Sequence, residues 1–98
     1  MQLLGERWDN RKANANQTKH GVSFEEAATA LEEALSITFH DPDHSLDEFR
    51  FLTFGQSSTG RILVVADTDR GEAVRLVSAR PATRSERRAY EEGSPQQF

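Results

Sequence analysis

The 98-residue sequence contains no cysteine, and it has only one tyrosine, one tryptophan and three prolines. Without cysteine, disulfide bonds and thiol chemistry are excluded. The longest apolar run covers residues 62–66, which is far too short to cross a bilayer. The N-terminal residues lack the long apolar stretch of a secretory signal peptide. We therefore expect a cytoplasmic protein that does not insert into membranes.

Lysine is also scarce, because ten of the twelve basic residues are arginine. Arginine makes planar, two-pronged contacts to phosphate and keeps its charge at any working pH. The net charge of −4 is unevenly distributed: residues 1–60 carry five basic and ten acidic residues, whereas residues 61–90 carry seven arginines and four acids. This polarity predicts a phosphate-binding surface on an acidic chain, although short chains also become polarised by chance.

Capping signals predict two helices in the first third of the chain. Asp9 caps a polar helix that runs to about residue 19 and is ended by Gly21. Ser23 and Glu26 form a capping box, in which the Glu26 side chain reaches back to the helix start, and this second helix extends to about residue 34. Its apolar stripe comprises Ala27, Ala28, Leu31 and Leu35.

From residue 48 the apolar residues alternate with a period of two, which is typical of strands joined by short turns. The expected strands are residues 3–8, 36–40, 49–56, 61–68 and 73–80. A second capping box, Thr83 to Glu86, begins a last helix to about residue 92. The pattern predicts an α+β fold in one domain, residues 1–98, with 93–98 as a frayed tail. We expect an antiparallel sheet with the helices packed on one face.

Two sets of motifs extend across most of the chain. The first comprises Trp8-Asp9, Lys12, Asn16 and the run Lys-His-Gly-Val-Ser-Phe-Glu-Glu-Ala at residues 19–27. The second comprises Glu48, Arg50, Gly55, Gly60-Arg61, Arg75, Ser78-Ala79-Arg80, Ala82-Thr83, Glu86-Arg87 and Tyr90. In order and spacing, over about residues 6–92, these motifs resemble the BrnT-type toxins, the toxin half of a type II toxin–antitoxin pair.

The resemblance implies a RelE-like fold and cleavage of RNA without a metal or other cofactor. It also implies a small BrnA-like antitoxin that neutralises the toxin and represses their shared promoter as a complex. No helix-turn-helix pattern occurs in this chain, so contact with DNA is expected only through the antitoxin. An acidic or amphipathic antitoxin helix is expected to cover the arginine-bearing face of the sheet.

RNA cleavage of this kind uses the 2′-hydroxyl of the substrate as nucleophile, and the enzyme must stabilise the extra negative charge on the phosphate. Given the resemblance, Arg50, Arg61 and Arg80 are the predicted catalytic arginines. The predicted RNA-binding residues are Arg75, Arg84 and Arg87. The alternative for each is a solvated charge that protects a strand edge from aggregation.

For the groups that transfer protons, the sequence provides candidates that each have a structural alternative. Glu48 is a candidate general base, yet its spacing from Arg50 equally favours a carboxylate that orients the guanidinium, because a neighbouring cation weakens a base. Tyr90 is a candidate to stack on a base or to donate a proton, and packing of its ring on the sheet is an equal alternative. His20 fits a helix-capping role, and Trp8 fits the core.

Two further hypotheses follow from individual residues. His40, Asp41, Asp43 and His44 have the residue types of a metal site, but a proline-containing turn explains them better, so no metal is predicted. Asp67 and Pro81 depart from the family pattern, in which a histidine or tyrosine and a basic residue are expected. With the acidic net charge, they motivate the alternative of a non-catalytic module that binds its antitoxin and takes part in promoter control.

Overall fold

The computed structural model describes residues 8–41, 49–69 and 74–93 of the chain. Its elements are α1 (Asn10–His20), α2 (Phe24–Leu31), β1 (Ile37–His40), β2 (Phe49–Gln56), β3 (Ile62–Asp69), β4 (Val74–Pro81) and α3 (Arg84–Glu92). The predicted α+β class is therefore confirmed. The strand predicted at residues 3–8 lies almost wholly outside the described residues.

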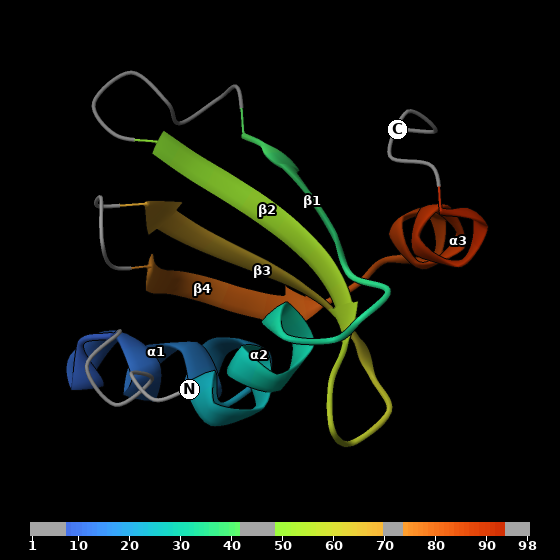
Figure 1. Ribbon diagram of the computed structural model, residues 1–98. Helices are drawn as coiled ribbons and strands as arrows, with labels where there is room; N and C mark the ends of the chain where they lie inside the picture. Colours follow the sequence, from blue (N-terminus) through green and yellow to red (C-terminus); the bar gives the residue numbers. More distant parts are fainter. Residues whose placement is uncertain (1–7, 42–48, 70–73, 94–98) are drawn as a thin grey trace.

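The four strands form one antiparallel sheet in the order β1-β2-β3-β4, so each strand pairs with its neighbour in sequence (Figure 1). The pairing of β3 with β4 shifts by one residue: Ala66 opposes Ser78, whereas Asp67 opposes Leu76. Val77 is thus an extra residue on β4, as in a β-bulge. Because of this bulge, Leu76 and Ala79 both pack into the core although they are three residues apart.

The core lies between the sheet and the two N-terminal helices, which cover one of its faces (Figure 1). Its buried members are Val22, Phe24, Ala27, Ala30, Leu63, Val65, Leu76 and Ala79. Trp8 packs against this cluster with its ring edge-on to Phe24, at a centroid distance of 5.7 Å. The alanines of α2 allow a close approach to the sheet: a Cβ on Gly55 of β2 would lie 2.2 Å from the carbonyl oxygen of Ala30.

Both ends of α2 differ from their predictions. Ser23 Oγ accepts from the Glu26 amide at 3.0 Å as predicted, but the Glu26 side chain turns to the β2–β3 hairpin instead of returning to the cap. The helix ends at Leu31, three residues early. Leu35 therefore leaves the helical stripe, and it is 72% exposed.

The C-terminal helix α3 carries a complete capping box between Thr83 and Glu86, as predicted. It lies beyond the ends of β2 and β4, apart from α1 and α2, rather than on the face that those helices cover (Figure 1). Ala89 is its one buried residue among those described. A helix held by so little apolar surface depends on polar anchors.

Candidate nucleic-acid interface

Three residues on neighbouring strands form a row across the sheet face opposite α1 and α2. Thr68 of β3 is paired with Arg50 of β2 on one side and with Arg75 of β4 on the other. Directly opposed residues of antiparallel strands project their side chains to the same face. Since Leu63 and Val65 face the core, Thr68 and its two partners belong to the other face. Both arginines are partly exposed, and Thr68 is buried.

Arg80 joins the same face because of the bulge at Val77. It is paired with Val64, which lies four residues before Thr68 on β3. Arg75 and Arg80 are five residues apart, and a regular strand would have placed them on opposite faces. Instead, they share one face about 13 Å apart along the strand. We call Arg50, Arg75 and Arg80 the sheet arginines.

The Arg80 guanidinium forms a two-pronged ion pair with Glu86 of α3, with N–O distances of 2.7 and 2.8 Å. The pair holds the pKa of the Glu86 carboxyl below its usual range, chiefly through the hydrogen bonds from Arg80. The Arg80 side chain remains 39% exposed. It is open to an incoming phosphate, which would compete with Glu86 for the same donors.

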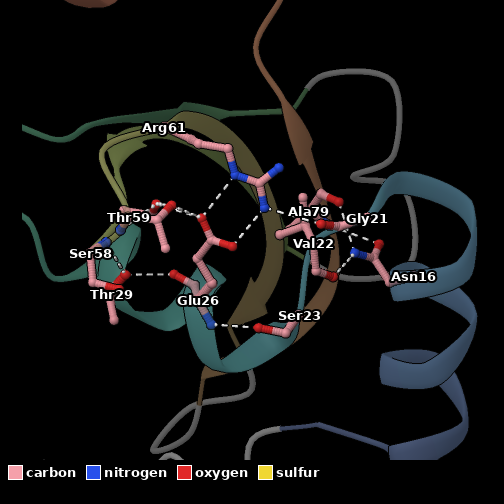
Figure 2. Close-up of polar contacts among 11 residues, drawn as sticks. Asn16, Gly21, Val22, Ser23, Glu26, Thr29, Ser58, Thr59, Arg61 and Ala79 are labelled. Carbon is pink, nitrogen blue, oxygen red and sulfur yellow. Dashed lines mark hydrogen bonds and ion pairs between the residues drawn. The ribbon is translucent and has the colours of Figure 1, made fainter.

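Arg61 lies on the other side of the sheet and is separated from the sheet arginines. Its position immediately before β3 places its side chain on the face of Leu63 and Val65, as the alternation of the strand predicts. There its Nη2 atom donates to Glu26 Oε1 at 2.6 Å and to the Gly21 carbonyl at 3.1 Å (Figure 2). Arg61 thus holds the start of α2 against the hairpin.

Glu26 is the centre of this polar cluster, whereas the sequence predicted for it only a capping role at the start of α2. Its Oε2 atom accepts from the hydroxyls of Ser57 and Thr59, each at 2.6 Å, and from Arg61 Nε at 3.1 Å (Figure 2). These bonds, above all those from Arg61, lower the pKa of Glu26 to about 2. The sequence signal that could have revealed this role is the run of three hydroxyl residues at 57–59, because two of these hydroxyls donate hydrogen bonds to the Glu26 carboxylate.

Tyr90 is similarly bound to a carboxylate. Its hydroxyl donates to Glu33 Oε1 at 2.8 Å, and Glu33 also accepts from the amides of Leu35 and Gln56. Burial and the nearby Glu33 carboxylate raise the pKa of Tyr90 to about 12. This bond anchors α3 to the segment between α2 and β1.

The remaining predicted site residues divide by position. Arg84 and Arg87 are exposed on α3. Glu48 lies outside the described residues. The structure therefore brings Arg50, Arg75 and Arg80 onto one face, with Arg84 and Arg87 on the helix beyond its end, whereas Arg61 belongs to a different face.

Asp67 also lies away from the sheet arginines. It is paired with Leu76 of the core and is 7% exposed. Its side chain faces a cavity of about 420 Å³ next to the end of α2, lined also by Leu31 and Thr53. The register thus assigns the aspartate that departs from the family pattern to the sheet face opposite the sheet arginines.

Residues 8–41, 49–69 and 74–93 contain neither a cluster of metal ligands nor a membrane-spanning helix. Within these ranges no three His, Cys, Asp or Glu side chains lie close enough together to hold a metal ion. The His40 ring contacts Phe51 edge-on, while Asp43 and His44 of the proposed cluster lie outside the described residues. No helix in this part of the chain is long and apolar enough to span a membrane.

The chain matches a known protein family. A sequence model of the ribonuclease toxin BrnT of type II toxin–antitoxin systems matches residues 8–86, which include all the sheet arginines. The chain belongs to the BrnT family. No curated protein sequence matches it significantly.

A solved BrnT structure shares the fold. The crystal structure of the Brucella abortus ribonuclease toxin BrnT is 26% identical to this chain, and the two superpose with a TM-score of 0.62. The match covers 79% of this chain and 94% of the Brucella chain. BrnT proteins are ribonuclease toxins of type II systems, so an antitoxin partner follows from membership of the family.

Proposed function

We propose that this BrnT family member is a metal-independent endoribonuclease whose substrate phosphate binds at the sheet arginines. The observation that carries the proposal is the placement of Arg50, Arg75 and Arg80 on one face by register and bulge. Three guanidinium groups on one face of an acidic protein form a local phosphate-binding surface. The family's description as ribonuclease toxins supports this reading.

Besides the RNA and these arginines, the reaction requires a general base and a general acid, and it requires no metal ion. The 2′-oxygen forms a bond to the adjacent phosphorus, and the bond from phosphorus to the 5′-oxygen breaks. A base takes the 2′-proton and an acid supplies a proton to the leaving oxygen. The arginines stabilise the additional negative charge at phosphorus, and removal of one such donor costs roughly 3–4 kcal/mol of transition-state stabilisation. Glu48 remains the candidate base, and Arg84 and Arg87 would bind the flanking RNA.

Arg61 and Tyr90 take positioning roles in this scheme. Arg61 fixes α2 to the hairpin through Glu26, and Tyr90 fixes α3, which carries Glu86 and the exposed arginines, through Glu33. A tyrosine whose pKa is raised to about 12 by burial and by a neighbouring carboxylate is a poor proton donor at neutral pH. Loss of either side chain should act through stability and geometry.

The proposed partner is a BrnA-like antitoxin encoded beside the toxin, which binds DNA on behalf of the complex. An acidic or amphipathic segment of the antitoxin would cover the sheet arginines, with carboxylates in place of phosphates. Neutralisation and RNA binding would then exclude each other. We place both events in the cytoplasm.

Expression of the chain without its antitoxin tests the proposal. Growth and total RNA are followed over time for the wild type, Arg75→Ala and Arg80→Ala, with Arg88→Ala, an exposed arginine of α3, as the control. We expect growth arrest and RNA breakdown in the wild type and in the control, and neither in the first two variants. The purified chain should also cut RNA in the presence of a metal chelator. Full toxicity in both sheet variants would rule out the assigned site.

A second function, a non-catalytic antitoxin-binding module, is favoured by one specific observation. Three of the predicted catalytic side chains are bound to carboxylates: Arg61 to Glu26, Arg80 to Glu86 and Tyr90 to Glu33. Such pairing reduces their availability to a substrate. This alternative predicts healthy growth, intact RNA and a soluble chain that still binds the antitoxin.

A further inference from the structure

Helix α1 has an unusual composition for a helix of an acidic protein. Its eleven residues include Arg11, Lys12, Lys19 and His20 but no aspartate or glutamate, whereas the whole chain carries a net charge of −4. Asn16 is the one residue that it buries, and no large apolar side chain occurs in it. The exposed surface of α1 therefore consists of cations, side-chain amides and small residues.

Asn16 fixes this polar helix to the edge strand β4. Its Nδ2 atom donates to the carbonyls of Ala79 at 2.8 Å and Val22 at 2.9 Å, and its Oδ1 atom accepts from the Ala79 amide at 3.0 Å (Figure 2). The side-chain amide thus pairs with β4 as a neighbouring strand would. Because Asn16 is only 6% exposed and fully bonded, it sets the position of α1 against the sheet.

A cavity of about 270 Å³ lies between α1 and β4. Lys12, Lys19 and His20 line it from the helix, and Val77 and Ser78 line it from the strand. Lys12 and Lys19 are seven residues apart, which is about two helical turns, so both project to one side of α1. The cavity is bordered by the two lysines, and the residues that line it within the described part of the chain include no aspartate or glutamate.

This cavity adjoins the face of the sheet arginines. Ser78 lines the cavity. It is also paired with Ala66 of β3, and this pair lies between the Thr68–Arg75 pair and the Val64–Arg80 pair on the same face of the sheet. The bulge residue Val77 is the other contribution of β4. A chain crossing the sheet arginines toward β4 would therefore pass next over Lys12, Lys19 and His20.

We infer that the α1–β4 cavity is a second phosphate subsite, which binds the backbone of a single-stranded RNA whose reacting phosphate lies at the sheet arginines. The inference rests on the proposed function and adds to it the path of the substrate. Single-stranded RNA fits better than a protein partner, because nucleic-acid interfaces are polar and strongly positive. Protein interfaces need large apolar or aromatic residues at their centre, and the sequence of α1 contains none.

The test compares Lys12→Ala with Arg11→Ala, which removes the same charge from the next residue of the same helix but from outside the cavity. Binding is measured by fluorescence anisotropy with a short labelled RNA that is 2′-O-methylated and so cannot be cut. Loss of one phosphate contact should weaken binding about fivefold at about 0.1 M salt and reduce the slope of log Kd against log salt by about 0.7. Lys12→Ala should show both changes, as should Lys19→Ala, while Arg11→Ala should resemble the wild type.

Two further measurements make each outcome decisive. Lys12→Gln, which keeps a polar side chain of most of the original length but removes the charge, should weaken RNA binding as Lys12→Ala does, with a melting temperature close to that of the wild type. Equal effects of the Lys12 and Arg11 variants would overturn the subsite while leaving the proposed function intact. A wild-type chain that neither binds nor cuts RNA would overturn the proposed function, and the subsite with it. A Lys12 variant that loses only the antitoxin would assign the cavity to the partner instead.

Discussion

Glu26 Oε1 lies 2.6 Å from Arg61 Nη2, so the first turn of α2 is bonded to the residue immediately before β3. The same carboxylate accepts the hydroxyls of Ser57 and Thr59. One partly buried carboxylate therefore fixes both the hairpin and the helix that covers it. Arg61, which the sequence predicted to be catalytic, stabilises this junction between helix and hairpin.

The Glu26 junction predicts a specific pH dependence of stability. The pKa of Glu26 is lowered from 4.5 to about 2 in the folded chain, so its stabilisation is complete above the unfolded pKa and is lost as the pH falls from about 5 to about 2. Glu26→Gln should lower the free energy of unfolding by roughly 2 kcal/mol near neutral pH, after allowance for screening at the partly exposed Arg61. Urea unfolding of both proteins across this range should show the difference vanish at low pH, and a constant difference would contradict the assignment.

Gly55→Ala should destabilise the chain by about 1–3 kcal/mol. The added methyl carbon would lie 2.2 Å from the Ala30 carbonyl oxygen. The methyl is attached to the backbone of β2 and the oxygen belongs to the backbone of α2, so the collision is relieved only if α2 and β2 separate. Gly21→Ala is the control, since that position has a positive φ of 71° but nothing within 4 Å of a Cβ. Thermal unfolding should rank the Gly55 variant as the less stable, and the reverse order would show that backbone strain outweighs the collision.

Glu86→Gln and Arg80→Ala should change RNA affinity in opposite directions. Glutamine keeps an acceptor for the Thr83 amide in the capping box but removes the charge that competes for Arg80. We expect Glu86→Gln to tighten binding of a non-cleavable RNA by up to about fivefold, the value of one phosphate contact, and Arg80→Ala to weaken it by a similar factor. Anisotropy titrations at fixed salt measure both. Weaker binding by Glu86→Gln would mean that the ion pair itself shapes the RNA site.

Tyr90 is the single tyrosine of the chain, so an ultraviolet absorbance titration reports on it alone. Its ionisation should have a midpoint near pH 12, because burial and the Glu33 carboxylate raise its pKa from 10.0. The sign follows directly: the folded pKa is raised, so the stability that Tyr90 contributes is present below pH 10 and is lost as the pH rises toward 12. Glu33→Gln should move the midpoint toward 10. A wild-type midpoint near 10 would show that the bond is absent in solution.

Several elements were predictable from the sequence because their signals are local. Asp9 and Gly21 bracket α1, Thr83 and Glu86 begin α3, and alternation gave β2 as residues 49–56. Caps and alternation depend on neighbouring residues, which the sequence contains in full. Local signals failed at both ends of α2. The helix ends at Leu31, before the Leu35 of its predicted stripe, and the Glu26 carboxylate binds donors in the hairpin instead of its own helix cap.

The sequence by itself thus determined where most helices and strands lie and to which family the chain belongs, and it contains the arginines of the candidate site. Only the tertiary structure decided which arginines share a face. The bulge at Val77 turns Arg80 to the side of Arg75, and register sets Arg50 in the same row, while Arg61 points the other way. Register and bulges depend on contacts between residues far apart in the chain, and a shift of one residue reverses the face of every side chain beyond it. The face on which each arginine lies therefore follows from strand pairing, which no local pattern specifies.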